Sequence, residues 1–186
     1  MARAVVITGP SGVGKGTLIR SLRERIPHLQ LSISATTRLP RAGETQGVDY
    51  HFLSPEQFER HVADGDFVEH AAYAGARYGT LRSELQTRMA SGAPVLLEIE
   101  VQGARQVREA MPEALQVFIA PPSIESLRAR LVGRGTDDPG QIEKRLQTAA
   151  EELAAADEFA EVVVNDRLEA AVDELEAVVA RATATL

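Results

Sequence analysis

The chain has 186 residues, of which 44% are apolar and 25% charged, with a formal net charge of −7 and no cysteine. This size and composition predict one globular domain and exclude collagen-like, coiled-coil and disordered chains. The lack of cysteine excludes disulfides, thiolate metal sites and a cysteine nucleophile. The negative charge argues against binding to nucleic acid, which depends on neutralising phosphates.

The longest apolar runs, residues 4–7 and 94–97, are far shorter than the ~18 residues of a membrane-spanning helix. The opening residues, MARAVVITGPSG, contain no long apolar segment of the kind that a secretory signal needs. We therefore expect a cytoplasmic protein that does not associate with membranes.

Short apolar runs typical of buried strands alternate along the chain with segments of helical spacing. The runs lie at residues 4–8, 29–34, 94–100, 115–120 and 161–165. This alternation predicts an α/β fold with a mostly parallel, five-stranded sheet flanked by helices. Ser54-Pro55 is typical of a helix start, and Gly65 and Gly92 are typical of helix ends.

Two segments interrupt the pattern. Residues 35–88 have fewer apolar residues but most of the aromatic ones, which predicts an inserted small lobe with mixed or antiparallel strands. Residues 133–141 are charged and rich in glycine and proline, which predicts a lid within a helical region at about 124–157. The core then consists of residues 1–34 and 89–186 of a single domain.

A P-loop follows the first predicted strand and precedes a predicted helix, which is the context that this motif requires. Its glycines let backbone N–H groups turn inward on a phosphate, and the helix N-terminus adds a partial positive charge. Thr17, not Gly16, supplies the hydroxyl near the lysine, so direct binding of Mg²⁺ by the loop is in doubt. The predicted ATP-binding residues here are Gly9, Pro10, Ser11, Gly12, Val13, Gly14, Lys15, Gly16 and Thr17.

Arg38 and Arg41 lie three residues apart in the segment after the second predicted strand. Two guanidinium groups at this spacing can clamp a second phosphate. Neutral hydrogen-bonding groups in the same region strengthen this interpretation, and they come from Ser34, Tyr50, Tyr78 and Thr80.

Glu98 and Glu100 lie two residues apart near the carboxyl end of the third predicted core strand, where ligands bind in open α/β sheets. Buried carboxylates require cations or hydrogen-bond donors. One of the two can meet a cation and the other a hydrogen-bond donor of a ligand, and the sequence leaves this division open. The four histidines have no metal-binding spacing, and we expect structural or surface roles for them.

Five ordered blocks of the chain resemble guanylate kinases: TTRLPRAGETQGVDYHF, FVEHAAYAGARYGT, LLEIEVQGA, FIAPPS followed by RLVGRGTD, and VVVND. The resemblance implies transfer of the γ-phosphate of ATP to GMP in purine nucleotide metabolism. Mg²⁺ would accompany ATP, held mainly through its phosphates and water, with Thr17, Glu98 or Glu100 as candidate ligands. We expect dGMP to be accepted weakly.

The resemblance also assigns roles residue by residue. The GMP-binding set comprises Ser34, Arg38, Arg41, Tyr50, Glu69, Tyr78, Thr80, Glu98 and Glu100. The predicted catalytic residues are Lys15, Arg38, Arg134 and Arg145, and further ATP contacts come from Arg130, Arg134 and Asn165. Glu69 suits guanine chemically, because its carboxylate can accept from N1–H and the exocyclic amine, whereas adenine has no N1–H.

Three other functions share some of these features. A protein-binding module with this fold is the main alternative, but the P-loop lysine and the lid arginines favour an enzyme. A regulatory GTPase is disfavoured because the chain has no N-K-x-D motif. An adenylate-type kinase shares the G-K-G-T run but does not explain the residues assigned to guanine.

Overall fold

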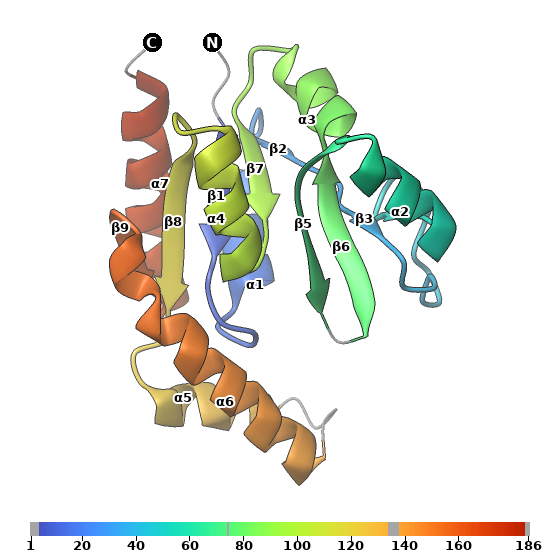
Figure 1. Cartoon of the computed structure of the whole chain (residues 1–186). Helices are drawn as coiled ribbons and strands as arrows, with labels where there is room; N and C mark the ends of the chain where they lie inside the picture. Colours follow the sequence, from blue (N-terminus) through green and yellow to red (C-terminus); the bar gives the residue numbers. More distant parts are fainter. Residues whose placement is uncertain (1–3, 74, 134–137, 185–186) are drawn as a thin grey trace.

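The structure is a computed structural model that describes residues 4–73, 75–133 and 138–184 (Figure 1). Five parallel strands form the main sheet in the order β2-β7-β1-β8-β9. They span Ala4–Thr8 (β1), Gln30–Leu31 (β2), Val95–Glu98 (β7), Leu115–Ala120 (β8) and Glu161–Val164 (β9). Each coincides with one of the five predicted runs, so the predicted parallel sheet is confirmed.

Successive residues of β1 point to opposite faces of this sheet. Val5 and Ile7 pack in a buried cluster with α1 (Lys15–Arg25) and α7 (Leu168–Ala184). Ala4 and Val6 pack on the other side, against α4 (Val101–Ala110). The sheet is therefore covered by helices on both faces, as the alternating sequence predicts.

A second sheet lies beside the first, in the region predicted to be an insertion (Figure 1). Its order is β4-β3-β6-β5, formed by His51–Phe52 (β4), Ala35–Thr36 (β3), Ala76–Leu81 (β6) and Phe67–Tyr73 (β5). The pairs β3–β6 and β5–β6 are antiparallel and the pair β3–β4 is parallel, so the sheet is mixed. Two helices accompany it, α2 (Pro55–Ala63) and α3 (Arg82–Met89). Ser54 begins α2 with a capping box, as its Ser-Pro pair predicts.

Two helices and a short 3₁₀ turn, η1 (Ala156–Glu158), occupy the region predicted to form the lid. α5 (Ile124–Gly133) and α6 (Pro139–Ala154) pack through a small buried cluster of their own, which includes Leu127, Leu131 and Ile142. They project from the end of the main sheet in Figure 1. Arg134, a predicted lid residue, lies outside the described residues.

Two predicted strands are too long. The strand predicted at residues 29–34 ends at Leu31, because the chain then crosses towards the second sheet. The strand predicted at residues 94–100 ends at Glu98, and Glu100 is the N-cap of α4. Glu100 therefore belongs to the strand-to-helix turn, which is a common place for ligand-binding residues in this class of fold.

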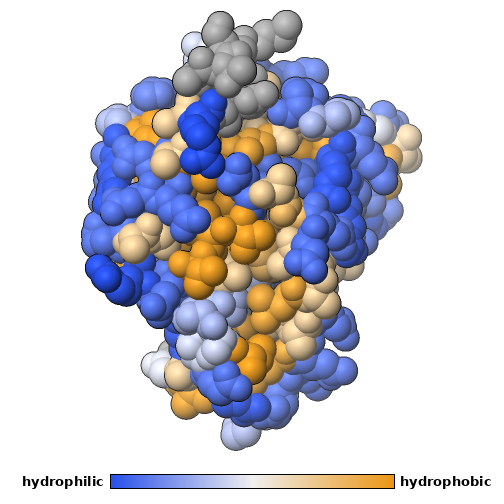
Figure 2. Space-filling view, turned by 90° about the vertical axis from the view of Figure 1, so that its left-hand side faces the viewer, coloured by the Kyte–Doolittle hydropathy of each residue, from blue (hydrophilic) through white to orange (hydrophobic). Residues whose placement is uncertain are grey.

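The outer strand β9 leaves Val162 and Val164 exposed. Figure 2 shows apolar surface along the middle of the side of the molecule that carries β9 and α7. Within the described ranges, no helix is long and apolar enough to cross a membrane.

Candidate active site

A cavity of about 580 Å³ lies between the P-loop, the carboxyl end of β7 and the second sheet. It is lined by residues of both predicted nucleotide sites, including Lys15, Ser34, Tyr50, Glu69, Tyr78, Glu98, Glu100 and Arg145. Residues that are far apart in the sequence are thus brought to one cavity, at the end of the sheet where α/β folds bind ligands.

The P-loop has the backbone conformation that its glycines predict. Gly9, Gly12 and Gly14 all have positive φ angles, of 136°, 88° and 102°. Glycine at the first position also allows close packing, since a Cβ on Gly9 would lie 2.2 Å from the carbonyl oxygen of Ile119. The Lys15 Nζ donates to the carbonyl oxygens of Gly9, at 2.5 Å, and Pro10, at 3.3 Å, so the ammonium group lies within the curve of the loop.

The P-loop is braced from behind at the carbonyl oxygen of Val13. That oxygen accepts hydrogen bonds from Arg130 Nη1, at 3.0 Å, and Asn165 Nδ2, at 2.8 Å. Arg130 Nη2 also donates to the carbonyl oxygen of Asn165, at 2.6 Å. Both predicted ATP contacts therefore support the loop backbone in this structure, and Arg145 is the described lid arginine that lines the cavity.

Arg38 and Arg41 meet at a carboxylate that the sequence analysis did not identify. The Arg38 guanidinium forms a bidentate pair with Glu44, with N–O distances of 2.8 and 2.9 Å, and the backbone N–H of Arg41 donates to the same carboxylate at 2.7 Å. The hydrogen bond from Arg38 lowers the pKa of Glu44. The Arg38 guanidinium lies 5.2 Å from the centre of the Tyr50 ring, which in turn contacts Tyr78 edge-on. Arg38 thus lies behind the aromatic lining of the cavity, whereas Arg41 is exposed in the adjoining loop, and neither arginine is among the residues that line the cavity.

Glu69 is directed to the cavity by a bulge in β5. Phe67 pairs with Leu81 and Glu69 with Thr80, so Val68 is an extra residue on this strand. The Thr80 hydroxyl donates to Glu69 Oε1 at 2.7 Å, and both side chains are almost fully buried. Burial raises the pKa of Glu69 to about 7, against the opposing effect of the hydrogen bond from Thr80.

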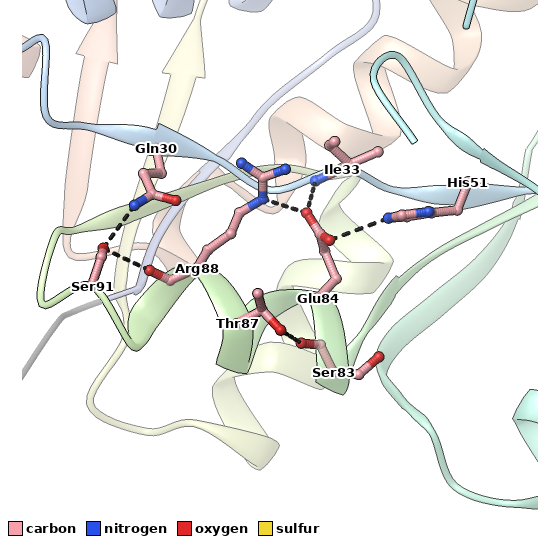
Figure 3. A network of polar contacts seen from close by, with 8 residues as sticks. All are labelled: Gln30, Ile33, His51, Ser83, Glu84, Thr87, Arg88 and Ser91. Carbon is pink, nitrogen blue, oxygen red and sulfur yellow. Dashed lines mark hydrogen bonds and ion pairs between the residues drawn. The ribbon is translucent and has the colours of Figure 1, made fainter. Parts of the chain in front are cut away.

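A polar network holds the segment that carries Ser34 (Figure 3). Glu84 of α3 accepts from the backbone N–H of Ile33 at 3.2 Å, from Arg88, and from His51 Nε2 at 3.2 Å. Burial opposes ionisation, but the hydrogen bonds prevail and the pKa of Glu84 is lowered. The network therefore connects the crossover between the two sheets to α3 and β4, which places Ser34 at the cavity wall.

Glu98 and Glu100 both line the cavity beside Lys15, as predicted. Glu98 is exposed to the open cavity, but the surrounding walls still desolvate its carboxylate and raise its pKa, while the charge of Lys15 acts in the opposite direction. Glu152 of α6 lies against Glu100, and burial together with this carboxyl group raises the pKa of Glu152. Glu152 is not among the residues that line this cavity, but it lines a neighbouring hollow together with Glu100 and so places an acidic group from the lid region behind that residue.

The family profile for guanylate kinase matches residues 1–182. The chain belongs to the guanylate kinase family. The guanylate kinase of Synechococcus sp. (strain CC9311) is 56% identical over 176 residues, which cover 95% of this chain and 93% of that protein. That of Mycolicibacterium paratuberculosis (strain ATCC BAA-968 / K-10) is 55% identical over 175 residues, covering 93% of this chain and 78% of that one.

Solved structures agree with this assignment. The guanylate kinase of Anaplasma phagocytophilum matches with a TM-score of 0.76 and 32% identity, over 97% of this chain and 85% of that chain. A gluconokinase of Sinorhizobium meliloti 1021 matches with a TM-score of 0.53 and 20% identity, over 98% of this chain and 94% of that chain, and shows a similarity of fold alone. The predicted family resemblance, P-loop fold and enzyme class are confirmed, and the comparisons give no support to a protein-binding module.

Three carboxylates of this guanylate kinase escaped the sequence analysis: Glu44, Glu84 and Glu152. For Glu44 a signal existed, because it follows the two arginines closely within one loop. Glu84 and Glu152 lie on helices whose sequences give no sign of a site, and only the fold shows that they face polar groups of other elements. The individual substrate roles of the residues around the cavity stay predictions.

Proposed function

We propose that the cavity divides the two substrates of the guanylate kinase reaction between its two walls. In this reaction the γ-phosphate of ATP is transferred to GMP, giving ADP and GDP. The P-loop wall takes ATP, and the wall formed by the second sheet takes GMP. The observation that carries this proposal is one continuous cavity lined by the P-loop lysine, Lys15, and by the buried carboxylate of Glu69.

On the ATP side, the loop glycines present backbone N–H groups to the phosphates. The Lys15 ammonium already lies within the loop, where it neutralises charge on the β- and γ-phosphates. We assign Asn165 to the adenine end and Arg130 to the same region, where both also brace the loop. Arg134 and Arg145 act on the transferring phosphoryl group from the lid region.

On the GMP side, we assign the acceptor phosphate to Arg38, Arg41, Tyr50 and Tyr78. Arg38 is held in place by Glu44 and by the Tyr50 ring, so its position is fixed before the substrate arrives. Guanine contacts come from Ser34, Glu69, Thr80 and one member of the acidic pair at residues 98 and 100, the other member of which serves Mg²⁺. The ionised Glu69 accepts from N1–H and the 2-amine, and an adenine would leave this buried charge unpaired.

The cavity also fits a divalent cation bound with ATP. Glu98 or Glu100 can supply an oxygen ligand beside Lys15. Among the described residues the buried Glu100 Oε2 accepts from no N–H or hydroxyl group, and the group that lies against Glu100 is the Glu152 carboxyl. Thr17 lines the same wall as a third candidate. Carboxylates are the side chains that Mg²⁺ prefers, often through water. When bound, Mg²⁺ neutralises negative charge on the transferring phosphates.

Three parts of the chain divide this work in our proposal. The core, residues 1–34 and 89–186, holds ATP, the lobe at about 35–88 holds GMP, and the region at about 124–157 closes as a lid. Closure excludes water, which would otherwise accept the phosphoryl group and waste ATP. The weak acceptance of dGMP and the cytoplasmic location also belong to this proposal.

A bisubstrate ligand tests whether the two nucleotides face each other across one cavity. We expect a compound with adenosine and guanosine joined by five phosphates to compete with both ATP and GMP. Its analogue with two adenosines is the control, and it should bind more weakly because adenine lacks the donors that Glu69 accepts. Competition with ATP alone would show that the second sheet does not hold GMP.

A further inference from the structure

Helix α4 of the core contacts strand β5 at the residues next to Glu69. β5 is the last strand of the second sheet, so one of its edges pairs with β6 and the other does not pair with a strand of that sheet. An unpaired strand edge exposes backbone N–H and C=O groups that need partners. At His70, α4 supplies these partners.

The partner is a single side-chain amide. Gln106 Oε1 accepts from the backbone N–H of His70 at 3.0 Å, and Gln106 Nε2 donates to the carbonyl oxygen of His70 at 2.8 Å. The amide therefore satisfies both backbone groups of one residue, as a neighbouring strand would. Since His70 follows Glu69 directly, this contact fixes the backbone of the predicted guanine-reading residue to the core.

The side chain of Glu69 depends on a second α4 residue, one helical turn before Gln106. A Cβ on Gly103 would lie 2.5 Å from Glu69 Oε2 and 3.2 Å from Glu69 Cδ. Real Cβ atoms do not approach other atoms so closely, so any larger residue at this position would displace the carboxylate. Gly103 has no positive φ angle and lies within a regular helix, where glycine is normally unfavourable relative to alanine. The space that it leaves for Glu69 accounts for a glycine here.

We propose that Gly103 and Gln106 are positioning residues for GMP, which together hold the Glu69 carboxylate at the cavity wall and thereby set the specificity for guanine. This inference rests on the proposed role of Glu69 in reading the base. Gly103 provides the room for the carboxylate, and Gln106 fixes the strand that carries it. The specificity of the GMP lobe is therefore determined in part by a helix of the core.

Steady-state kinetics of Gly103→Ala test this proposal. We expect the KM for GMP to rise at least 10-fold, because a displacement of about 1 Å from the productive geometry can reduce activity 100-fold. The KM for ATP should stay within about twofold of the wild-type value, and the melting temperature should not fall, because alanine favours the helix. Gln102→Ala is the matched control, since it adds an alanine at the neighbouring exposed position and should leave every constant unchanged.

A rescue variant separates displacement of Glu69 from general damage. Glu69→Asp shortens the side chain by one methylene group and makes room for a Cβ at position 103. In the double variant Gly103→Ala/Glu69→Asp, we expect the KM for GMP to be no higher than in the worse of the two single variants. If the two substitutions acted independently, the fold-increases in KM of the single variants would instead multiply. Gln106→Glu provides a second approach if Gly103→Ala does not fold, because it loses the donor to His70, and it should raise the KM for GMP more than that for ATP.

Different results would overturn the positioning role of Gly103 and the proposed role of Glu69 in guanine recognition. A Gly103→Ala enzyme with an unchanged KM for GMP, or single effects that multiply in the double variant, would overturn the positioning role. If Glu69→Asp itself left the KM for GMP unchanged, the proposed role of Glu69 in guanine recognition would be wrong, and the positioning role would fail with it.

Discussion

Replacing the buried carboxylate of Glu69 by an amide should make the protein more stable but weaken its use of GMP. Glu69 is 4% exposed, and its one hydrogen-bonding side-chain partner, among the described residues, is the Thr80 hydroxyl, which donates to Oε1. Glu69→Gln keeps an oxygen at this position and removes the charge. The variant therefore isolates what the protein loses in stability by holding a buried ionised group.

The size of the effect follows from the pKa of Glu69, which burial raises from 4.5 to about 7. At about 1.4 kcal/mol per pKa unit, this shift corresponds to about 3 kcal/mol. Because the folded state binds the proton more tightly, wild-type stability falls as the pH rises from about 4.5 to about 7, and the full loss is present above that range. The Gln variant does not titrate here, so its advantage should grow from near zero at low pH to about 3 kcal/mol at about pH 8.

Urea denaturation at about pH 5 and about pH 8 measures this difference directly. In thermal unfolding, the same gain corresponds to roughly 6–12 °C for a protein of this size. Glu24→Gln, an exposed position on α1, is the control and should change stability by less than about 0.5 kcal/mol at both values. The KM for GMP should rise about 10- to 100-fold in Glu69→Gln, as expected for losing a charged hydrogen-bond acceptor.

An equal stability difference at both pH values would show that Glu69 does not titrate with a raised pKa in the folded protein. A variant less stable than wild type at about pH 8 would contradict the reasoning outright, because it would mean that the charge stabilises the fold.

Three further predictions address other parts of the cavity. Lys15→Met should lower kcat at least 100-fold, by analogy with the loss of one preorganised donor. Lys144→Met, at the other lysine of the chain, is the control and should keep a kcat near that of the wild type. A folded Lys15→Met enzyme with near-native kcat would rule out the P-loop assignment. Arg41→Ala should raise the KM for GMP far more than that for ATP, with exposed Arg60→Ala as its control, and equal losses would place Arg41 outside the acceptor site. The KM for GMP should fall as the pH rises through about 7, because the ionised Glu69 binds guanine and burial keeps this carboxyl group protonated below that value. This step should be missing from the pH profile of Glu69→Gln.

The sequence predicts those parts of the fold and site that depend on residues close together in the chain. The P-loop requires three glycines between a strand and a helix, and Gly9, Gly12 and Gly14 have the positive φ angles that this motif implies. The capping box at Ser54 is equally local. The five core strands are predictable because each is a short apolar run with breaks on both sides.

Contacts between distant segments could not be predicted in this way. The bulge at Val68 that directs Glu69 depends on pairing with β6, and the room beside Gly103 exists only once α4 packs against β5. Arg130 illustrates the same limit, because its spacing in the lid region gives no sign that it bonds to the carbonyl oxygen of Val13, 117 residues away. The residue types at such positions are evident from the sequence, but their partners are set by packing.

The role of the Glu69 carboxylate in selecting the acceptor can be measured by comparing acceptor nucleotides. ADP formation from ATP is followed with GMP, AMP, CMP or UMP as the acceptor, in the wild type and in Glu69→Gln. If Glu69 reads the base, kcat/KM for GMP should exceed that for AMP by about 10⁴-fold in the wild type, and the ratio should fall in the variant. An AMP rate equal to the GMP rate, or a ratio that Glu69→Gln leaves unchanged, would contradict it.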